Sequence, residues 1–288
     1  MKAYHLFLCA VAVCLCSCEK PYLGEDAIEA GANVILRVTS MEQIPFDGEV
    51  ISRADESVTK LCSRLNFAIY QGDEKVKSLA QKQGDADYGT AGFSLPEGSY
   101  TLFVVAHNSG GTCTFTSRDK ITFKDNLVTD TYLYSGDLQV TRETQTIDLE
   151  LHRVVAMFRL VLTDEVPAEV SQLKFYYTGG SSTLSGDTGY GSVNSRQTVK
   201  LDVATGQRQF EVYTFPHAET GELKMVISAL DANGEVLRER TLENVPVTRN
   251  RITRYTGQFF SGSTGQTGSV SLNMTASSVW DGEDLQTF

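Results

Sequence analysis

The stretch SYTLFVVA, residues 99–106, decides the fold class, because it is apolar on both faces of an extended chain. A surface helix would instead repeat its apolar residues every three or four positions. A strand that is apolar on both faces is typical of the centre of a covered sheet. The stretch HRVVAMFRLVL, residues 152–162, has the same character. Both stretches therefore predict buried central strands.

On either side of these stretches, apolar and polar residues alternate with a period of two, which indicates half-buried strands. The runs that show it best are Val34, Leu36 and Val38; Leu65, Phe67 and Ile69; Ile147, Leu149 and Leu151; and Leu223, Met225 and Ile227. The sequence DANG, residues 231–234, separates two such runs and predicts a β-hairpin. No segment shows an amphipathic helix of ordinary length. The sequence therefore predicts an all-β protein built from β-sandwiches.

The strand-like runs are numerous enough for two tandem sandwich domains. We expect an N-terminal domain over 30–142 and a C-terminal domain over 143–260, with the boundary in the polar stretch 140–146. After residue 260 the chain becomes rich in glycine, serine and threonine. Residues 261–288 are therefore expected to form a flexible linker and a C-terminal tail.

The N-terminus has the parts of a bacterial lipoprotein signal. Residues 1–17 combine a basic start with an apolar run, as a signal peptide does. The sequence Leu15-Cys16-Ser17-Cys18 resembles a lipobox and predicts acylation, by palmitate-type chains, at Cys18. Residues 18–29 are expected to form an acidic tether, and such a segment resembles a surface-export signal. The alternative is a plain signal peptide or an N-terminal helix anchor.

Charge and hydropathy argue against a nucleic-acid partner and against a membrane-spanning helix after the signal segment. The formal charge of −11 argues against a basic surface for nucleic acid. Beyond residue 17 no stretch approaches the roughly 20 apolar residues of a spanning helix. We therefore expect membrane attachment through lipid at Cys18, on the outer membrane and with the protein exposed at the cell surface.

The sequence contains no recognisable catalytic constellation. Apart from His5, the histidines are His107, His152 and His217, and none has the spacing of a metal site. The nucleophile motif GxSxG and the phosphate-binding motif GxxxxGK[ST] are both missing. We therefore expect a protein that is not an enzyme and has no metal or cofactor.

Cys62 and Cys113 are the remaining thiols of the chain after Cys18. Outside the cytoplasm they form a candidate disulfide, which would contribute about 4 kcal/mol in the chain-entropy model. The alternative is two separate thiols, and the sequence leaves both readings open.

Several blocks together resemble the FimB/Mfa2 family, which comprises fimbrial anchor-type lipoproteins of Bacteroidetes. Besides the lipobox at Cys18, they are CSRLNFAIY (62–70), GTAGFSLPEGSYTLFVVAHNSGG (89–111), VTDTYLYSGDLQV (128–140), LHRVVAMFRLVLTDEVP (151–167), LKFYYTGGSSTL (173–184) and RITRYTGQFF (251–260). The resemblance covers about residues 30–260. It implies two transthyretin-like β-sandwich domains, lipid attachment and a role in anchoring fimbriae or limiting their assembly.

The residues and the resemblance lead to the same hypothesis, a lipid-anchored surface component of fimbriae. Its expected partners are fimbrial subunits, bound by β-strand addition. The alternative is a surface glycan-binding lipoprotein, which would stack exposed aromatic rings on sugars. The aromatic candidates for that alternative are Tyr176, Tyr177, Tyr190 and Trp280.

Overall fold

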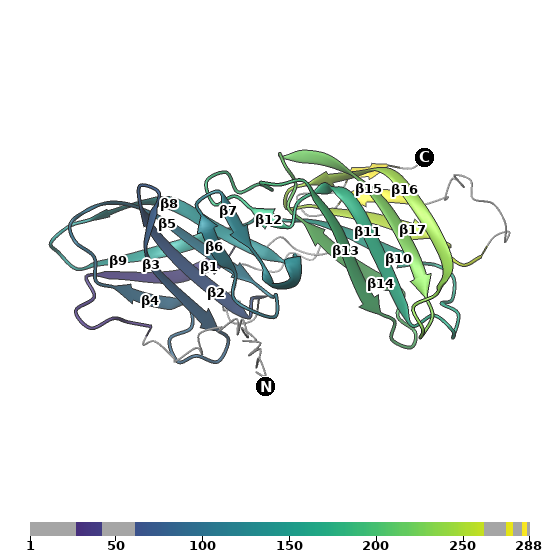
Figure 1. The fold of residues 1–288 in the computed structure, drawn as a ribbon, viewed down its shortest axis with the longest axis horizontal. Helices are drawn as coiled ribbons and strands as arrows, with labels where there is room; N and C mark the ends of the chain where they lie inside the picture. Colours follow the sequence, from purple (N-terminus) through teal and green to yellow (C-terminus); the bar gives the residue numbers. More distant parts are fainter. Residues whose placement is uncertain (1–26, 42–60, 262–274, 279–283, 287–288) are drawn as a thin grey trace, which may run out of the picture.

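The computed structural model describes residues 27–41, 61–261, 275–278 and 284–286, and these residues are mostly β-strands (Figure 1). The predicted all-β fold class is therefore confirmed. Figure 1 shows two lobes side by side, with β1 to β9 in or next to one lobe and β10 to β17 mainly in the other. No helix in the described part of the chain is long and apolar enough to cross a membrane.

The first lobe is a seven-stranded sheet in the order β3-β2-β5-β8-β9-β1-β4. Its strands are β1 (Val34–Met41), β2 (Arg64–Gln71), β3 (Glu74–Lys82), β4 (Thr90–Phe93), β5 (Gly98–His107), β8 (Thr131–Val140) and β9 (Gln145–Arg153). The pairing of β1 with β9 is parallel, and the other pairings are antiparallel. β8 and β9 pair only at Tyr132 with Arg153 and at Leu133 with His152, so the sheet folds there into two layers.

One hydrophobic core fills the space between these two layers. Leu36 from β1, Phe67 from β2 and Val104 from β5 are all fully buried in it. The predicted alternation in β1 is confirmed, because Leu36 and Val38 are buried while Arg37 between them is exposed. A side-chain period of two therefore places one face of each strand in the core.

The second lobe is a sandwich of two sheets, in the orders β14-β10-β17-β18-β19 and β13-β11-β15-β16. Its strands are β10 (Ala156–Leu162), β11 (Gln172–Gly180), β13 (Ser195–Asp202), β14 (Gln209–Thr214), β15 (Thr220–Leu230), β16 (Val236–Thr248), β17 (Ile252–Gly257), β18 (Thr275–Ser278) and β19 (Asp284–Gln286). The core between them includes Phe158, Phe175 and Met225. The hairpin predicted at 231–234 is confirmed, since Asp231 Oδ1 accepts the amides of Asn233 and Glu235 at the turn between β15 and β16.

A third hydrophobic cluster lies where the lobes meet. A small sheet in the order β12-β7-β6 spans the junction, with β6 (Thr114–Ser117) and β7 (Lys120–Thr122) next to the first lobe and β12 (Thr183–Leu184) from the second. Phe123 stacks on Phe215 with ring centroids 5.4 Å apart. Phe103 and Val105 of β5 point into this cluster, whereas Leu102 and Val104 point into the first core. The stretch 99–106 is therefore apolar on both faces because each face contacts a different core.

The stretch 152–162 carries the chain from one lobe to the other. β9 ends at Arg153 within the first sheet, and β10 begins at Ala156 in the second lobe. Val154 and Val155, between the two strands, are buried in the junction cluster. The expected boundary between 142 and 143 lies before β9, which still belongs to the first lobe. The chain passes into the second lobe only between Arg153 and Ala156. The segment that crosses between the lobes is apolar because it is buried. A polar stretch of sequence therefore does not identify the domain boundary.

A charged network is buried at the same junction. The Arg153 guanidinium donates to both carboxylate oxygens of Asp130, at 2.7 and 3.0 Å, and to the Tyr132 hydroxyl. A further hydrogen bond joins Arg153 to Asn250 of the second lobe at 3.4 Å. The Arg153 side chain is only 5% exposed. Burial would lower the pKa of Arg153, but the Asp130 hydrogen bond and charge outweigh it and raise that pKa.

Candidate functional site

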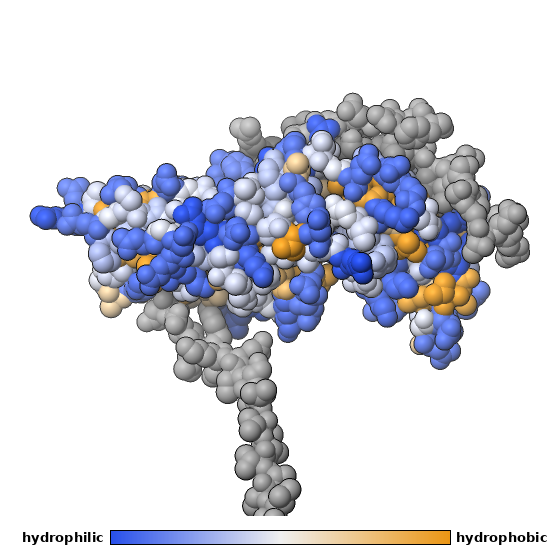
Figure 2. All heavy atoms as spheres, turned by 45° about the horizontal axis from the view of Figure 1, so that its top comes forward, coloured by the Kyte–Doolittle hydropathy of each residue, from blue (hydrophilic) through white to orange (hydrophobic). Residues whose placement is uncertain are grey.

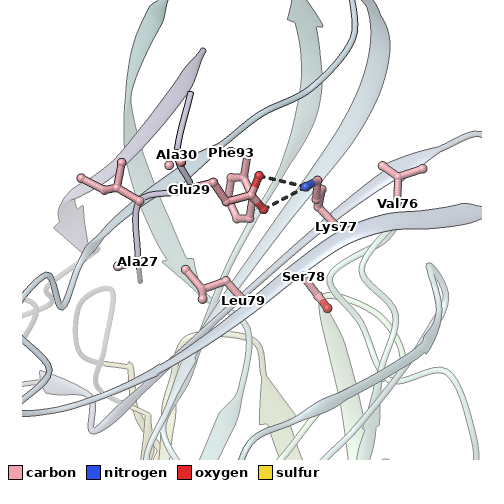
Figure 3. A pocket seen from close by; sticks show the side chains of 10 residues that line it. Ala27, Glu29, Ala30, Val76, Lys77, Ser78, Leu79 and Phe93 are labelled. Carbon is pink, nitrogen blue, oxygen red and sulfur yellow. Dashed lines mark hydrogen bonds and ion pairs between the residues drawn. The ribbon is translucent and has the colours of Figure 1, made fainter. Parts of the chain in front are cut away.

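A groove of about 510 Å³ lies where the two edges of the seven-stranded sheet come together (Figure 3). One wall is β3 and the other is β4, and these are the first and last strands of the sheet order. Residues 27–30 lie along the groove. The sheet thus folds into a sandwich in which the two end strands, β3 and β4, lie next to each other without pairing.

The β3 wall of the groove consists of the consecutive residues Val76, Lys77, Ser78 and Leu79. Successive side chains of a strand point to opposite faces, so a run of neighbours lines a groove when the strand edge faces it. Val76 and Leu79 pack against the first core, as does Phe93 from β4. The groove therefore combines a strand edge with an apolar floor.

Residues 27–29 pair with β4 and cover part of this groove. The Gly92 amide donates to the Ala27 carbonyl at 2.7 Å, and the Glu29 amide donates to the Gly92 carbonyl at 3.0 Å. A side chain at Gly92 would meet Ile28, because a Cβ placed there would lie 2.8 Å from Ile28 Cγ2. The last residues of the expected tether 18–29 are thus part of the folded lobe.

An ion pair closes the groove from one side to the other. Figure 3 shows Glu29 and Lys77 facing each other, and Lys77 Nζ lies 2.9 and 2.8 Å from the two Glu29 carboxylate oxygens. The Ser94 amide also donates to Glu29, at 2.9 Å. Burial would raise the pKa of Glu29, but the hydrogen bonds from Lys77 and Ser94 and the Lys77 charge outweigh it. The pKa of Glu29 is therefore lowered from its ordinary 4.5.

We predict that Glu29→Gln loosens residues 27–30 from the groove. A carboxyl with a lowered pKa stabilises the closed arrangement above its ordinary pKa, and this contribution is lost as the pH falls through the folded value. The pair is about one-third exposed, so protection of the Gly92 amide from hydrogen exchange should fall about twofold to fivefold. In the unaltered protein the same loss should develop below pH 4.5.

Glu97→Gln is the matched control for this measurement, because Glu97 forms an exposed ion pair with Arg142 elsewhere on the first lobe. Protection of Gly92 should not change in that variant. An equal loss of protection in both variants would contradict a specific role for Glu29.

The two cysteines of the candidate disulfide are both free and buried. Cys62 belongs to the core of the first lobe, and Cys113 belongs to the junction cluster. These clusters lie on opposite faces of the sheet that contains β2 and β5, so the disulfide is not formed in this structure. Burial raises the pKa of both thiols.

The aromatic candidates for sugar stacking do not form a common surface. Tyr177 is 1% exposed and donates its hydroxyl to the Tyr213 carbonyl at 2.7 Å. Its neighbour Tyr176 is 36% exposed and points to the other face of β11. Trp280, like Cys18, lies outside the described residues.

Tyr190 already has partners on the surface. The Arg249 guanidinium carbon lies 4.6 Å from the centroid of its ring, and its hydroxyl donates to Glu219 at 3.0 Å. One face of the ring is therefore occupied by a cation, which leaves less of it for a sugar.

His107 is a structural residue at the end of β5. Its ring lies 3.0 Å from the Asn66 amide nitrogen and accepts the Ser109 amide at Nδ1, at 3.1 Å. Burial, assisted by the Arg64 charge, lowers the pKa of His107 to about 4. The ring is therefore neutral near pH 7.

The groove residues could not be found from sequence patterns. Glu29 belongs to an acidic segment that is typical of a tether, and Lys77 lies 48 positions further along the chain. The only local signal is Gly92 between apolar neighbours, which is consistent with a close approach of backbone.

Several solved structures are similar to this chain over most of its length. Among solved structures, the fimbrial anchor protein Mfa2 from Porphyromonas gingivalis is 10% identical with a TM-score of 0.42, over 77% of this chain and 89% of that one. A fimbrial assembly protein from Parabacteroides distasonis is 12% identical with a TM-score of 0.41, over 88% and 97%. A candidate polysaccharide-binding protein from Bacteroides thetaiotaomicron is 8% identical with a TM-score of 0.46, over 78% and 91%.

No curated protein matches the sequence. A sequence model of the family of unknown function DUF6562 matches residues 29–287, which span both lobes and all of the groove lining except Ala27 and Ile28. The chain therefore belongs to the DUF6562 family.

Proposed function

We propose that this protein is a lipid-anchored component of fimbriae at the cell surface, related in role to the FimB/Mfa2 anchor lipoproteins. Acyl chains on Cys18 hold it to the outer membrane, and its sandwiches bind a fimbrial subunit. Binding of that subunit anchors the filament or limits its length. The lipobox at residues 15–18 and the sequence blocks over residues 30–260 support this proposal.

The groove between β3 and β4 is the observation that carries the proposal. An unpaired strand edge offers backbone donors and acceptors to an incoming strand. The apolar floor offers pockets for alternate side chains of that strand, and these pockets supply specificity. A partner segment that lies along β3 would therefore extend the sheet and bury Val76, which is only partly buried, further.

The surface supports a narrow contact of this kind. The face drawn in Figure 2 is mostly hydrophilic, with only small separate hydrophobic patches. A partner that binds this face would gain little from broad apolar burial, so backbone pairing along an edge is the better source of affinity. We infer a binding role rather than a catalytic one.

We predict that Val76→Glu reduces capture of the fimbrial partner at least about tenfold. A carboxylate on the groove wall would have to be buried without a partner under the incoming strand, which is unfavourable. The measurement is the amount of fimbrial subunit that co-purifies with the mature protein from outer membranes, quantified by mass spectrometry.

Val236→Glu is the control substitution, because Val236 is 50% exposed and lies on β16 of the second lobe. It should leave both co-purification and the β-sheet circular dichroism spectrum unchanged. Undiminished capture by a folded Val76→Glu protein would show that the groove does not bind the subunit.

A further inference from the structure

A second cleft, of about 550 Å³, lies where the two lobes meet. One wall is formed by β13 of the second lobe, and the opposite wall by β7 and by residues 125–127 of the first. It shares no lining residue with the groove between β3 and β4. The junction cleft, as we call it, is therefore a separate site.

The junction cleft faces the edge of β13. Residues 195–199 line it without interruption. Because neighbouring side chains alternate between faces, a continuous run of this kind presents the backbone edge of the strand. β13 is also the end strand of its sheet, so this edge has no neighbour within the sheet β13-β11-β15-β16. An extended chain that enters the junction cleft can hydrogen-bond to β13.

The charges that line the junction cleft are mainly positive. Lys120 and Arg196 carry positive charges there, against the single negative charge of Asp125. Neither cation forms an ion pair with any residue that the structure describes. The whole chain has a net charge of −11, so a positive cleft is a local departure from its surroundings. It complements an acidic ligand.

Apolar side chains at the junction cleft favour a peptide over a sugar. Leu127 and Val193 line it and are 39% and 41% exposed, so both can bury surface against a bound side chain. No aromatic residue is among the described residues that line it, although sugar sites commonly use aromatic rings for stacking.

We propose that the junction cleft binds an extended acidic peptide segment of a partner protein, paired by its backbone to β13. The acidic side chains contact Lys120 and Arg196, and an apolar side chain lies between Leu127 and Val193. This site is independent of the groove and of the fimbrial role proposed above, since none of its residues is used there.

The test uses a fluorescein-labelled hexapeptide of alternating glutamate and valine, titrated with the mature protein and followed by fluorescence anisotropy. We expect saturable binding at physiological salt. A peptide of alternating lysine and valine should bind at least about tenfold more weakly, because its charges repel the cleft. The glutamate peptide with alternate amides N-methylated keeps its charge but loses strand pairing, so it should also bind at least tenfold more weakly.

Variants of the protein locate the site. The double substitution Lys120→Glu with Arg196→Glu should weaken binding about tenfold or more. Lys200→Glu is the matched control, because Lys200 is exposed on the same strand but does not line the junction cleft. It should change binding less than twofold, because four residues of strand place Lys200 about 13 Å from Arg196. That separation exceeds the Debye length of about 8 Å at physiological salt.

Three results would overturn the proposal. They are equal binding of the glutamate and lysine peptides, equal loss in the double variant and in Lys200→Glu, and full binding of the N-methylated peptide. Binding of an oligogalacturonide in place of the glutamate peptide, abolished by the same double variant, would assign the cleft to acidic glycans instead. The substitutions in this test do not change any residue of the groove between β3 and β4. A failure of this proposal is therefore distinguishable from a failure of the co-purification test of the fimbrial role.

Discussion

Cells that carry Cys18→Ala are expected to lose the protein from the outer membrane fraction and to shed their fimbriae. Each buried acyl CH₂ contributes about 0.8 kcal/mol to membrane attachment, and stable attachment takes more than one chain. Without the thiol there is no acceptor for these chains. Fractionation with acyl-chain labelling measures the protein, and electron microscopy of cells and medium measures the filaments.

Cys16→Ala is the control for this prediction, because residue 16 lies in the segment that we expect to be removed. Labelling and fimbriae should both persist in that variant. If Cys18→Ala protein is labelled and retained like the unaltered protein, lipid attachment at Cys18 is excluded. If the protein is released while filaments remain bound to the cell, the anchoring role is excluded and lipid attachment still holds.

Asp130→Ala should give the largest loss of stability, about 3 to 5 kcal/mol. The substitution removes the carboxylate that compensates the Arg153 guanidinium, which is only 5% exposed. A buried charge without its partner is far less favourable than the same charge in water. Because Arg153 also contacts Asn250 of the second lobe, the loss should affect the junction between the lobes. Urea unfolding followed by far-ultraviolet circular dichroism measures the change.

Asp148→Ala is the matched comparison, since it removes a carboxylate from an exposed pair with Arg37 whose side chains are 51% and 56% exposed. Exposed pairs of this kind contribute about 0 to 1 kcal/mol. The two variants should therefore differ by at least about 2 kcal/mol. Similar free energies of unfolding for both would mean that water reaches Arg153 and that the network is not a buried one.

Local patterns were sufficient to predict the class of structure. The period of two in residues 34–38 and the DANG turn at 231–234 both correspond to features of the folded chain. These signals are local, because a strand buries alternate residues and a hairpin turn requires particular residues at its corner. The resemblance of blocks between residues 30 and 260 added an expected role, which no local pattern carries.

The boundary between the lobes shows where local patterns mislead. The polar residues after Val140 form only the connection between β8 and β9, while the crossing at Val154 and Val155 is buried and apolar. A polar stretch is usually interpreted as a linker, because linkers are usually solvated. Here the junction has its own hydrophobic core, so the true crossing resembles the interior of a strand.

The sequence by itself determined an all-β chain with strongly apolar central strands, because burial on a pleated strand imposes a period that can be read residue by residue. Only the tertiary structure decided where strand edges meet. Glu29 forms an ion pair with Lys77, and β13 lies opposite residues 125–127. These pairs are far apart in sequence, and a local period of two carries no information about such contacts. Both sites are made when sheets fold over and lobes dock, and the residues involved look like ordinary surface positions until that packing brings them together.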